Sequence, residues 1–331
     1  MPISEPESVA IITAAYRAIL AREPDPDGLT AYAALFNGRD THDAFQKILE
    51  GLLGSAEFAK RTATSMGLAP SADLTSLSVD DVEVAMIVCN EEDFISTSLE
   101  PLLPHFSRFI ILDMNSEDNT VSVARDLLGS RLTVLSCSQG NLLHQGYGWA
   151  RNFAAASATK PWLLFVDADE VLQNGIVNRK IDLSKPAQLT TVATIERRNL
   201  DDQTWTSGAP IDLAKCRCVS VETKRRLYKC GSGARWQGYI HEEIVLREEL
   251  RWGAKSSLVF NHFSNFKEPQ RLVSRNRMYS WMLLRLFRND ELREGVNRYW
   301  LDEYIPRNLA KVEIEAQEFI ADHPELRKYN L

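Results

Sequence analysis

Residues 162 to 170 read Trp162-Leu163-Leu164-Phe165-Val166-Asp167-Ala168-Asp169-Glu170, an apolar run that ends in three carboxylic acids. The apolar part is typical of a buried strand. Side chains two positions apart on an extended chain share a face, so Asp167 and Asp169 can point the same way. Two such carboxylates suit a divalent cation that carries a diphosphate, because Mg²⁺ and Mn²⁺ prefer oxygen ligands and leave room for substrate oxygens. A polar strand exit with solvated acids is the alternative interpretation.

Strands and helices alternate around this stretch. Strand-like runs cover residues 82–89, 109–114, 132–137 and 162–168, and helical patterns cover 93–103, 118–128 and 144–156. This order predicts an α/β fold with a largely parallel sheet and right-handed crossovers. Ligands of such sheets bind beyond the carboxyl ends of the strands. The polar residues expected there are Asn90, Glu91, Asp113, Asp167 and Asp169.

Both ends of the chain have helical patterns. Helices are expected within residues 1–68, including 43–53 and 55–64, and again over 266–287 and 307–320. Residues 69–81 are rich in Ser, Ala and Asp and read as a linker. We therefore expect a small all-helical domain at 1–68, a linker at 69–81, an α/β domain at 82–266 and a C-terminal helical extension at 267–331.

Composition narrows the class of protein. The chain has 331 residues, with 44% hydrophobic and 25% charged residues, which is ordinary for a globular protein with ample core. A formal net charge of -7 argues against general affinity for nucleic acid. Without a long apolar run or a signal-peptide pattern, a cytoplasmic location is expected. The five cysteines are an odd number and are expected to be reduced thiols, with zinc binding by residues 216–230 as the alternative.

Four motifs follow one another within residues 82–266. They read Val88-Cys89-Asn90-Glu91-Glu92, Ile111-Leu112-Asp113-Met114-Asn115-Ser116-Glu117-Asp118-Asn119-Thr120, Ala150-Arg151-Asn152 and Phe165-Val166-Asp167-Ala168-Asp169-Glu170. Together they resemble the ordered motifs of family 2 glycosyltransferases, which have the GT-A fold. The second motif of that family commonly reads D-x-x-S-x-D-x-T, and this chain matches it. The resemblance implies a Rossmann-like, mostly parallel sheet with flanking helices.

The resemblance also implies an activity. It is that of an inverting glycosyltransferase, which moves a sugar from a nucleoside-diphosphate-sugar, here expected to be a UDP-sugar, to a saccharide, lipid-linked or protein acceptor. Mg²⁺ or Mn²⁺ would neutralise charge on the leaving diphosphate. Asp169 is the expected metal ligand, and Asp167 would contact metal-bound water or the donor. His262 resembles a position where several GT-A enzymes supply a third ligand, although a core or surface histidine is the alternative.

The nucleotide and diphosphate would be bound by a second set of residues. Asp113 would accept hydrogen bonds from the base or ribose, unless it caps the following helix. A guanidinium from Arg151 could reach a phosphate, and a surface arginine is the alternative. Cys89 stands where the family often has an aromatic residue, which leaves the identity of the base open. The full set of expected binding residues is Asn90, Glu91, Asp113, Arg151, Asp167 and Arg226, with Arg225 as the alternative to Arg226.

A later block resembles one bacterial branch of the family, in which W-x-G-x-x-H-E follows a basic strand. Here it reads Arg235-Trp236-Gln237-Gly238-Tyr239-Ile240-His241-Glu242. Sugar transfer needs a group that removes the proton of the acceptor hydroxyl. Glu242 is the expected base and His241 the alternative, with a polar loop as the structural interpretation.

Two further regions suggest partners. Residues 16–29 resemble a small bacterial helical module of unknown function, which we assign to acceptor recognition, homo-oligomerisation or domain packing. The helix at 266–288 carries many basic side chains, which indicate a solvated face or, alternatively, peripheral contact with an anionic acceptor or the inner face of the membrane.

Two other functions remain open from the sequence. A sugar-1-phosphate nucleotidyltransferase would need a glycine-rich basic loop after the first strand, where this chain has Asn90-Glu91-Glu92-Asp93. An inactive nucleotide- or glycan-binding adaptor would not need Asp167, Asp169, His241 and Glu242 together.

Overall fold

The computed structural model describes most of the chain. The described residues are 5–20, 22–36, 41–53, 55, 75–184, 191–202, 204–206, 209, 211–245, 254–294 and 296–329. Apart from Ser55, the helix predicted over 55–64 lies outside them, as do residues 69–74 of the predicted linker. The chain divides into two compact units, Met1–Ser71 with Cys230–Arg235, and Ala72–Lys229 with Trp236–Leu331.

The described part of the first unit is mainly helical. It contains α1 (Glu5–Leu20), α2 (Pro26–Ala33), the short helix η1 (Ala34–Phe36) and α3 (Thr41–Leu53). Asp25 caps α2, because its Oδ1 accepts from the Gly28 amide at 2.8 Å. Apolar residues at helical spacing, among them Ile12, Tyr16, Ile48 and Leu52, form the core.

The second unit is built on one mixed sheet. Its strands follow the order β1-β8-β13-β9-β10-β5-β2-β3-β4, with β6 beside β13 and β7 beside β8. The strands are β1 (Ser76–Ser78), β2 (Val82–Val88), β3 (Phe109–Asp113), β4 (Leu132–Ser136), β5 (Trp162–Phe165), β6 (Glu170–Asn174), β7 (Ile176–Val177), β8 (Lys180–Ser184), β9 (Val192–Asp201), β10 (Arg217–Lys229) and β13 (Lys255–His262). Two further short strands are β11 (Arg235–Gln237) and β12 (Glu243–Val245). Within the predicted linker, residues 76–81 form β1 and the short helix η2 (Val79–Asp81).

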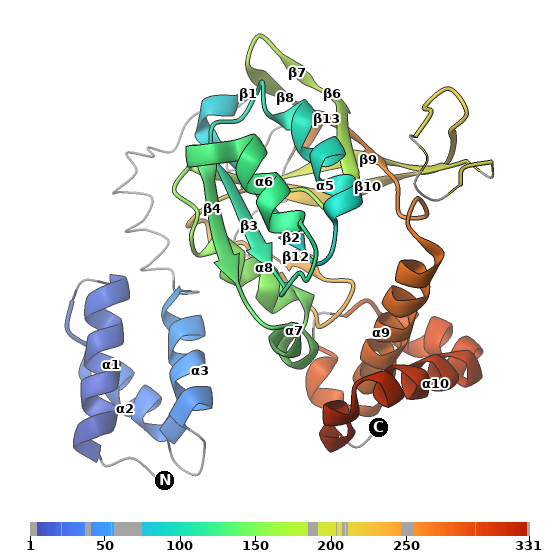
Figure 1. The fold of residues 1–331 in the computed structure, drawn as a ribbon. Helices are drawn as coiled ribbons and strands as arrows, with labels where there is room; N and C mark the ends of the chain where they lie inside the picture. Colours follow the sequence, from blue (N-terminus) through green and yellow to red (C-terminus); the bar gives the residue numbers. More distant parts are fainter. Residues whose placement is uncertain are drawn as a thin grey trace. The chain divides into compact units, whose positions relative to one another are not determined.

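The parallel part of the sheet is the part that the sequence predicted. Strands β5, β2, β3 and β4 run parallel, so their carboxyl ends meet at one edge (Figure 1). Beyond β5 the sheet continues through β10, which is antiparallel to both β5 and β9. The α/β fold is confirmed, and the antiparallel strands bring a second set of side chains to the same edge.

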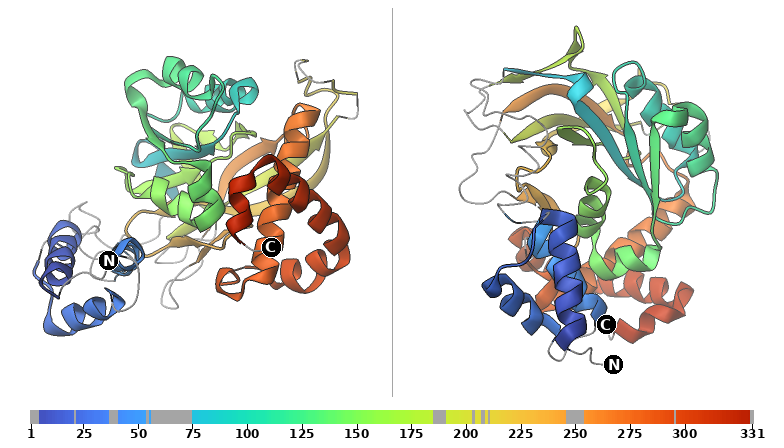
Figure 2. Two further views of the ribbon diagram at one scale, coloured as in Figure 1. Left: turned by 60° about the horizontal axis from the view of Figure 1, so that its bottom comes forward. Right: turned by 90° about the vertical axis from the view of Figure 1, so that its left-hand side faces the viewer.

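Helices cover both faces of the parallel strands. On one face, α5 (Glu92–Leu99) and α6 (Thr120–Leu128) contribute Ile95, Leu99 and Leu128 to the main core. On the other face, α8 (Tyr147–Ala155) contacts β2 and β3 (Figure 2). Short 3-10 turns follow α5 and α6, at η3 (Glu100–Leu102) and η4 (Gly129–Arg131).

The helix predicted over 144–156 is two helices. Instead, α7 (Gln139–Gln145) ends just before Gly146 and α8 begins just after it, at Tyr147; the φ of Gly146 is 86°. A Cβ at Gly146 would lie 2.4 Å from the carbonyl oxygen of Tyr239. The neighbouring Tyr147 amide donates to that oxygen at 2.8 Å. The break therefore lets a distant backbone segment approach the chain closely.

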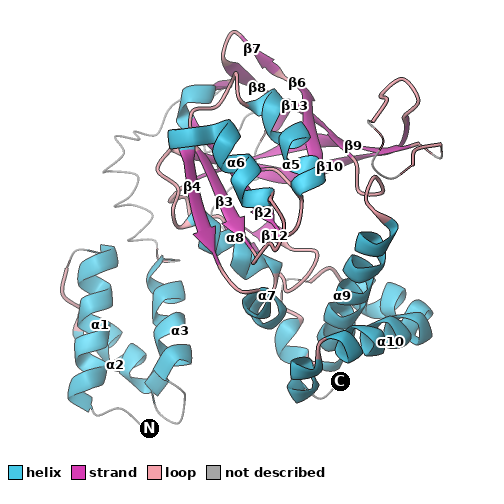
Figure 3. Ribbon diagram, viewed as in Figure 1, coloured by secondary structure: helices cyan, strands magenta, loops and turns pink. Residues whose placement is uncertain are grey.

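The C-terminal region is helical, as predicted (Figure 3). It contains α9 (Pro269–Arg288), the turns η5 (Asp290–Leu292) and η7 (Pro324–Tyr329), a π-helical turn η6 (Trp300–Tyr304) and α10 (Ile305–Asp322). Trp281, Met282, Leu286, Ile305 and Phe319 form a second core between α9 and α10. Among the described helices, none combines the length and the apolarity that crossing a bilayer requires.

Candidate active site

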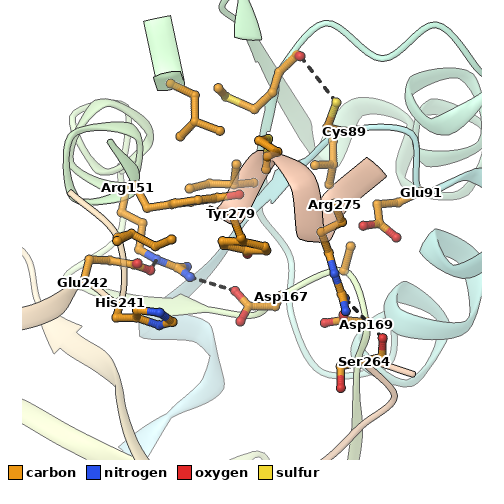
Figure 4. A pocket seen from close by; sticks show the side chains of 18 of the residues that line it. Cys89, Glu91, Arg151, Asp167, Asp169, His241, Glu242, Ser264, Arg275 and Tyr279 are labelled. Atoms are coloured by element: carbon orange, nitrogen blue, oxygen red, sulfur yellow. Dashed lines mark hydrogen bonds and ion pairs between the residues drawn. The ribbon is translucent and has the colours of Figure 1, made fainter. Parts of the chain in front are cut away.

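A cleft of about 1280 Å³ lies at the carboxyl ends of β2, β3 and β5. Residues that follow these strands line one side of the cleft. Residues of β10, of the 236–243 segment and of α9 line the rest of it. Figure 4 shows Arg151 and Asp167 pointing toward each other, with His241 and Glu242 close by. Nine of the predicted site residues line this cleft: Asn90, Glu91, Arg151, Asp167, Asp169, Arg226, His241, Glu242 and His262.

Asp167 is held by two arginines. Arg151 Nη2 lies 2.9 Å from its Oδ1, and Arg226 Nη2 lies 2.5 Å from its Oδ2. Burial alone would raise the pKa of Asp167, but the guanidinium groups of Arg226 and Arg151 hold it well below its ordinary value. Asp167 is therefore ionised, and both of its oxygens are already engaged.

Arg151 joins Asp167 to the expected base. Its Nε lies 2.5 Å from Glu242 Oε1, and the side chains of Arg151 and Glu242 are 6% and 10% exposed. The Arg151 guanidinium also packs over the Trp236 ring, with its Cζ 4.7 Å from the centroid. Asn152, the next residue on α8, exchanges two hydrogen bonds with the Trp236 backbone. The third motif and the W-x-G-x-x-H-E block thus form one assembly.

His241 is a neutral imidazole in this setting. Its backbone has φ 56°, and its ring stacks on Trp300 of η6 with centroids 3.6 Å apart. Burial lowers the pKa of His241 to about 4, with the Lys224 ammonium acting in the same direction and the Glu242 carboxylate opposing it. At neutral pH the ring can accept a hydrogen bond from a hydroxyl group.

Asp169 faces a histidine and a lysine. Its Oδ1 lies 3.5 Å from His262 Nε2, and its Oδ2 lies 3.4 Å from Lys267 Nζ. Although burial opposes ionisation, Lys267 and His262 keep the pKa of Asp169 below its ordinary value. Lys267 also lies 2.7 Å from Glu91 Oε1, so this ammonium joins the exits of β2 and β5.

The donor atoms at Asp169 suit a divalent cation. Asn199 Nδ2 donates to Ser220 and Glu222, which turns its Oδ1 toward His262 Nδ1 at 2.7 Å. The Nδ1 proton of His262 is then donated to Asn199, so Nε2, which lies on the side of Asp169, is the ring nitrogen that could coordinate a cation. One carboxylate and one imidazole leave positions for diphosphate and water oxygens, as Mg²⁺ and Mn²⁺ require. Among the described residues, no group of three or more His, Cys, Asp or Glu side chains is placed to hold a metal ion.

The loops after β2 and β3 interlock. The Asn90 amide donates to Ser116 Oγ at 2.9 Å, and Asn90 Oδ1 accepts from the Glu117 amide at 2.8 Å. Asp113 Oδ1 accepts from the Ser116 amide at 3.0 Å, and Asp113 is not among the described residues that line the cleft. The D-x-x-S-x-D-x-T motif therefore builds this loop, and Asp113 contributes a hydrogen-bond acceptor to it.

A buried ion pair supports the floor of the cleft. Glu170 is fully buried, its Oε2 accepts from the Asp167 amide at 3.0 Å, and its Oε1 lies 3.4 Å from Arg197 on β9. Burial, together with the charge of Asp167, raises the pKa of Glu170. Arg197 is not among the site residues predicted from the sequence, because its contact with Glu170 depends on the antiparallel part of the sheet.

The basic residues near α9 have partners inside the protein. Lys267, Arg271 and Arg275 line the cleft, whereas Arg277 and Arg288 form ion pairs with acids of α10. Arg271 Nη1 donates to the Asn90 carbonyl at 3.0 Å. The interpretation of these basic residues as a solvated face did not predict that Lys267, Arg271 and Arg275 line the cleft. Their spacing of four residues was an available signal, because it places 267, 271 and 275 on one side of the helix predicted over 266–287, although Lys267 lies just before α9 in the structure.

Residues 83–207 match the family described as Glycosyl transferase family 2. This segment resembles that family. The match supports a glycosyltransferase, and it includes Asn90, Arg151, Asp167 and Asp169. Glu242 and His262 lie beyond it. No curated protein matches the sequence.

Several solved structures resemble the chain at low identity. TarS 1–349 from S. aureus has 17% identity and a TM-score of 0.35, over 71% of this chain and 76% of that chain. The same protein in complex with UDP-GlcNAc has 15% identity and a TM-score of 0.34, over 72% and 78%. Glucosyl-3-phosphoglycerate synthase from Mycobacterium tuberculosis, in complex with Mn²⁺, UDP and phosphoglyceric acid, has 19% identity and a TM-score of 0.24, over 36% and 43%.

Proposed function

We propose that this protein is an inverting, metal-dependent glycosyltransferase that uses a nucleoside-diphosphate-sugar. The single observation that carries the proposal is that Asp167, Asp169, His241 and Glu242 line one cleft. These residues come from separate motifs, and the cleft lies where ligands of parallel sheets bind. A UDP-sugar is the proposed donor, and a saccharide, lipid-linked or protein hydroxyl is the proposed acceptor.

The donor would bind at the exits of β2 and β5. Asn90 and Glu91 line the cleft and would contact the nucleotide, and Lys267, Arg271 and Arg275 would supply positive charge for the diphosphate. Arg151 and Arg226 hold Asp167 ionised and each occupies one lone pair of its two oxygens, so a second lone pair on each oxygen could accept a hydrogen bond from the donor. Asp169 and His262 would hold Mg²⁺ or Mn²⁺, which would stabilise negative charge on the departing diphosphate.

Glu242 is the proposed base. Among the described contacts, only its Oε1 is engaged, by Arg151, so its Oε2 can accept the proton of the acceptor hydroxyl. As that proton moves to Glu242, the acceptor oxygen bonds to the anomeric carbon and the bond to the diphosphate breaks. His241 is proposed to accept a hydrogen bond from the acceptor, since its ring is neutral and lines the same cleft.

Donor binding is tested by thermal denaturation with a panel of UDP- and GDP-sugars, with and without Mn²⁺. We expect one nucleotide-sugar to raise the melting temperature by several degrees, because a ligand that binds only the folded state stabilises it. Asp169→Ala should abolish the Mn²⁺-dependent part of this shift. Asp182→Ala, which removes an exposed acid on β8, is the matched control and should keep the full shift. The absence of a shift with every nucleotide-sugar would contradict the proposal and favour an adaptor that binds glycans.

A further inference from the structure

The ammonium group of Lys267 is a cation that already lies beside the Asp169 carboxylate. Its ammonium lies between two acids, 2.7 Å from Glu91 Oε1 and 3.4 Å from Asp169 Oδ2. The Lys267 and Asp169 side chains are each 12% exposed, and Glu91 is 18% exposed. Water therefore screens these charges weakly, and their interaction is stronger than at an exposed surface.

The neighbouring arginines cannot replace this ammonium. Arg151 and Arg226 are bound to the two oxygens of Asp167, and Arg271 interacts with Glu92, Asp93 and Asp118. Within the described part of the chain, Lys267 is the lysine or arginine that forms an ion pair with Asp169. Its removal would leave two partly buried carboxylates, Asp169 and Glu91, facing a site without their counter-ion.

We infer that Lys267 is the resident counter-ion of Asp169 in the free protein and competes there with a divalent cation. The inference rests on the metal site in the proposed function. A cation bound by Asp169 and His262 would share a carboxylate with the ammonium, and the two positive charges would repel each other. Free metal is therefore bound weakly. An anionic diphosphate would add the negative charge that lets both cations stay in the cleft.

The test measures Mn²⁺ binding directly, by the electron paramagnetic resonance signal of unbound Mn²⁺, without nucleotide. Lys267→Met keeps most of the length of the side chain and removes its charge. We expect it to bind Mn²⁺ about tenfold more tightly than the wild type, because the repulsion between the ammonium and the metal ion is relieved. The gain should disappear in Lys267→Met/Asp169→Asn. Lys267→Arg, which keeps the positive charge, should restore weak binding.

Arg271→Met is the matched control for a general change of charge. It removes one positive charge from the same cleft but leaves the pair of Asp169 and Lys267 intact. Its Mn²⁺ affinity should stay within about threefold of the wild type, because a screened charge at greater distance has a small effect. If Arg271→Met gained as much Mn²⁺ affinity as Lys267→Met, the inference would be overturned, because the loss of any positive charge from the cleft would then have the same effect.

Thermal denaturation gives a second readout. In EDTA, Lys267→Met should melt below the wild type, and Mn²⁺ should raise its melting temperature by more than that of the wild type. Equal Mn²⁺ affinity in the two proteins, including no binding in either, would overturn the inference. Failure of the proposed function is seen separately, because no nucleotide-sugar would then raise the melting temperature of the wild type. If only the inference fails, the donor shift of the wild type remains.

Discussion

At the scale of single residues, Arg151 organises the chemistry of the cleft. One guanidinium contacts Asp167 through Nη2 and Glu242 through Nε, and it is almost fully buried. A bound arginine fixes the orientation of a carboxylate because its donors lie in a rigid plane. Arg151 thereby fixes the orientation of Glu242 through Oε1, and Oε2 remains available for proton transfer.

Glu242→Gln should separate binding from turnover. The amide keeps the size of the side chain but cannot take up a proton, so we expect the rate of sugar transfer to fall about 100-fold or more while the donor-induced thermal shift remains. Glu243→Gln is the matched control, because Glu243 is the adjacent acid, its side chain is 56% exposed, and its partner is Arg225. Rates should be measured with saturating donor and acceptor. Undiminished turnover of Glu242→Gln would reject it as the base.

At the scale of elements, the exits of β2 and β3 form one interlocked structure. Asn90 has φ 55° and Asn115 has φ 66°, a left-handed conformation that asparagine adopts more readily than most residues. The Glu91 amide donates to Thr120 Oγ1 at 2.7 Å, and the Glu92 amide to Asp118 Oδ2 at 3.2 Å. The first turn of α5 is therefore satisfied by side chains of the second motif.

Asn90→Ala should destabilise this structure. It removes the acceptor of the Glu117 amide and places alanine in a left-handed conformation, so we expect the free energy of unfolding to fall by about 2 kcal/mol. Asn90→Asp keeps an acceptor and a favourable conformation and should lose well under half of that amount. Urea denaturation followed by tryptophan fluorescence measures both. Equal losses in the two variants would show that the side-chain acceptor is unimportant.

At the scale of the whole second unit, Arg285 joins the C-terminal helices to the cleft. Arg285 lies on α9 and is 7% exposed. Its Nη1 donates to the carbonyl of Leu143 and, at 3.1 Å, to the hydroxyl of Tyr239. Its guanidinium also lies over the Tyr329 ring, 4.4 Å from the centroid. The C-terminal helices thus support the segment that carries His241 and Glu242.

Arg285→Ala should therefore be costly for stability. The loss of a buried side chain and of its hydrogen bonds should lower the free energy of unfolding by about 3 kcal/mol. Arg277→Ala is the matched control on the same helix, where a partly exposed arginine pairs with Glu318 and Asp322. That variant should lose less than about 1 kcal/mol, because exposed ion pairs contribute little. Chemical denaturation of both variants distinguishes these outcomes. Similar losses would contradict the role of Arg285.

Local sequence patterns were sufficient for the parallel part of the fold. Buried strands at β2, β3 and β5 follow from continuous apolar runs, and the half-buried β4 follows from its β-branched and apolar residues; the helices between them follow from the 3.6-residue period. The position of the acids also follows from the sequence, because each motif comes directly after a strand and parallel strands end at one edge. For this reason Asn90, Glu91, Asp167 and Asp169 are expected at one edge of the sheet, and all four line the cleft.

Tertiary structure alone decided which charges meet. Asp167 and Asp169 are two residues apart, yet the first is bound by two arginines and the second faces His262 and Lys267. Those partners come from α8, β10, β13 and the segment before α9, and no local pattern sets their distances. Asp113 shows the same limit, because a carboxylate after a strand can face a ligand or brace a loop. Ion pairing depends on distance and burial, which arise only when remote segments pack together.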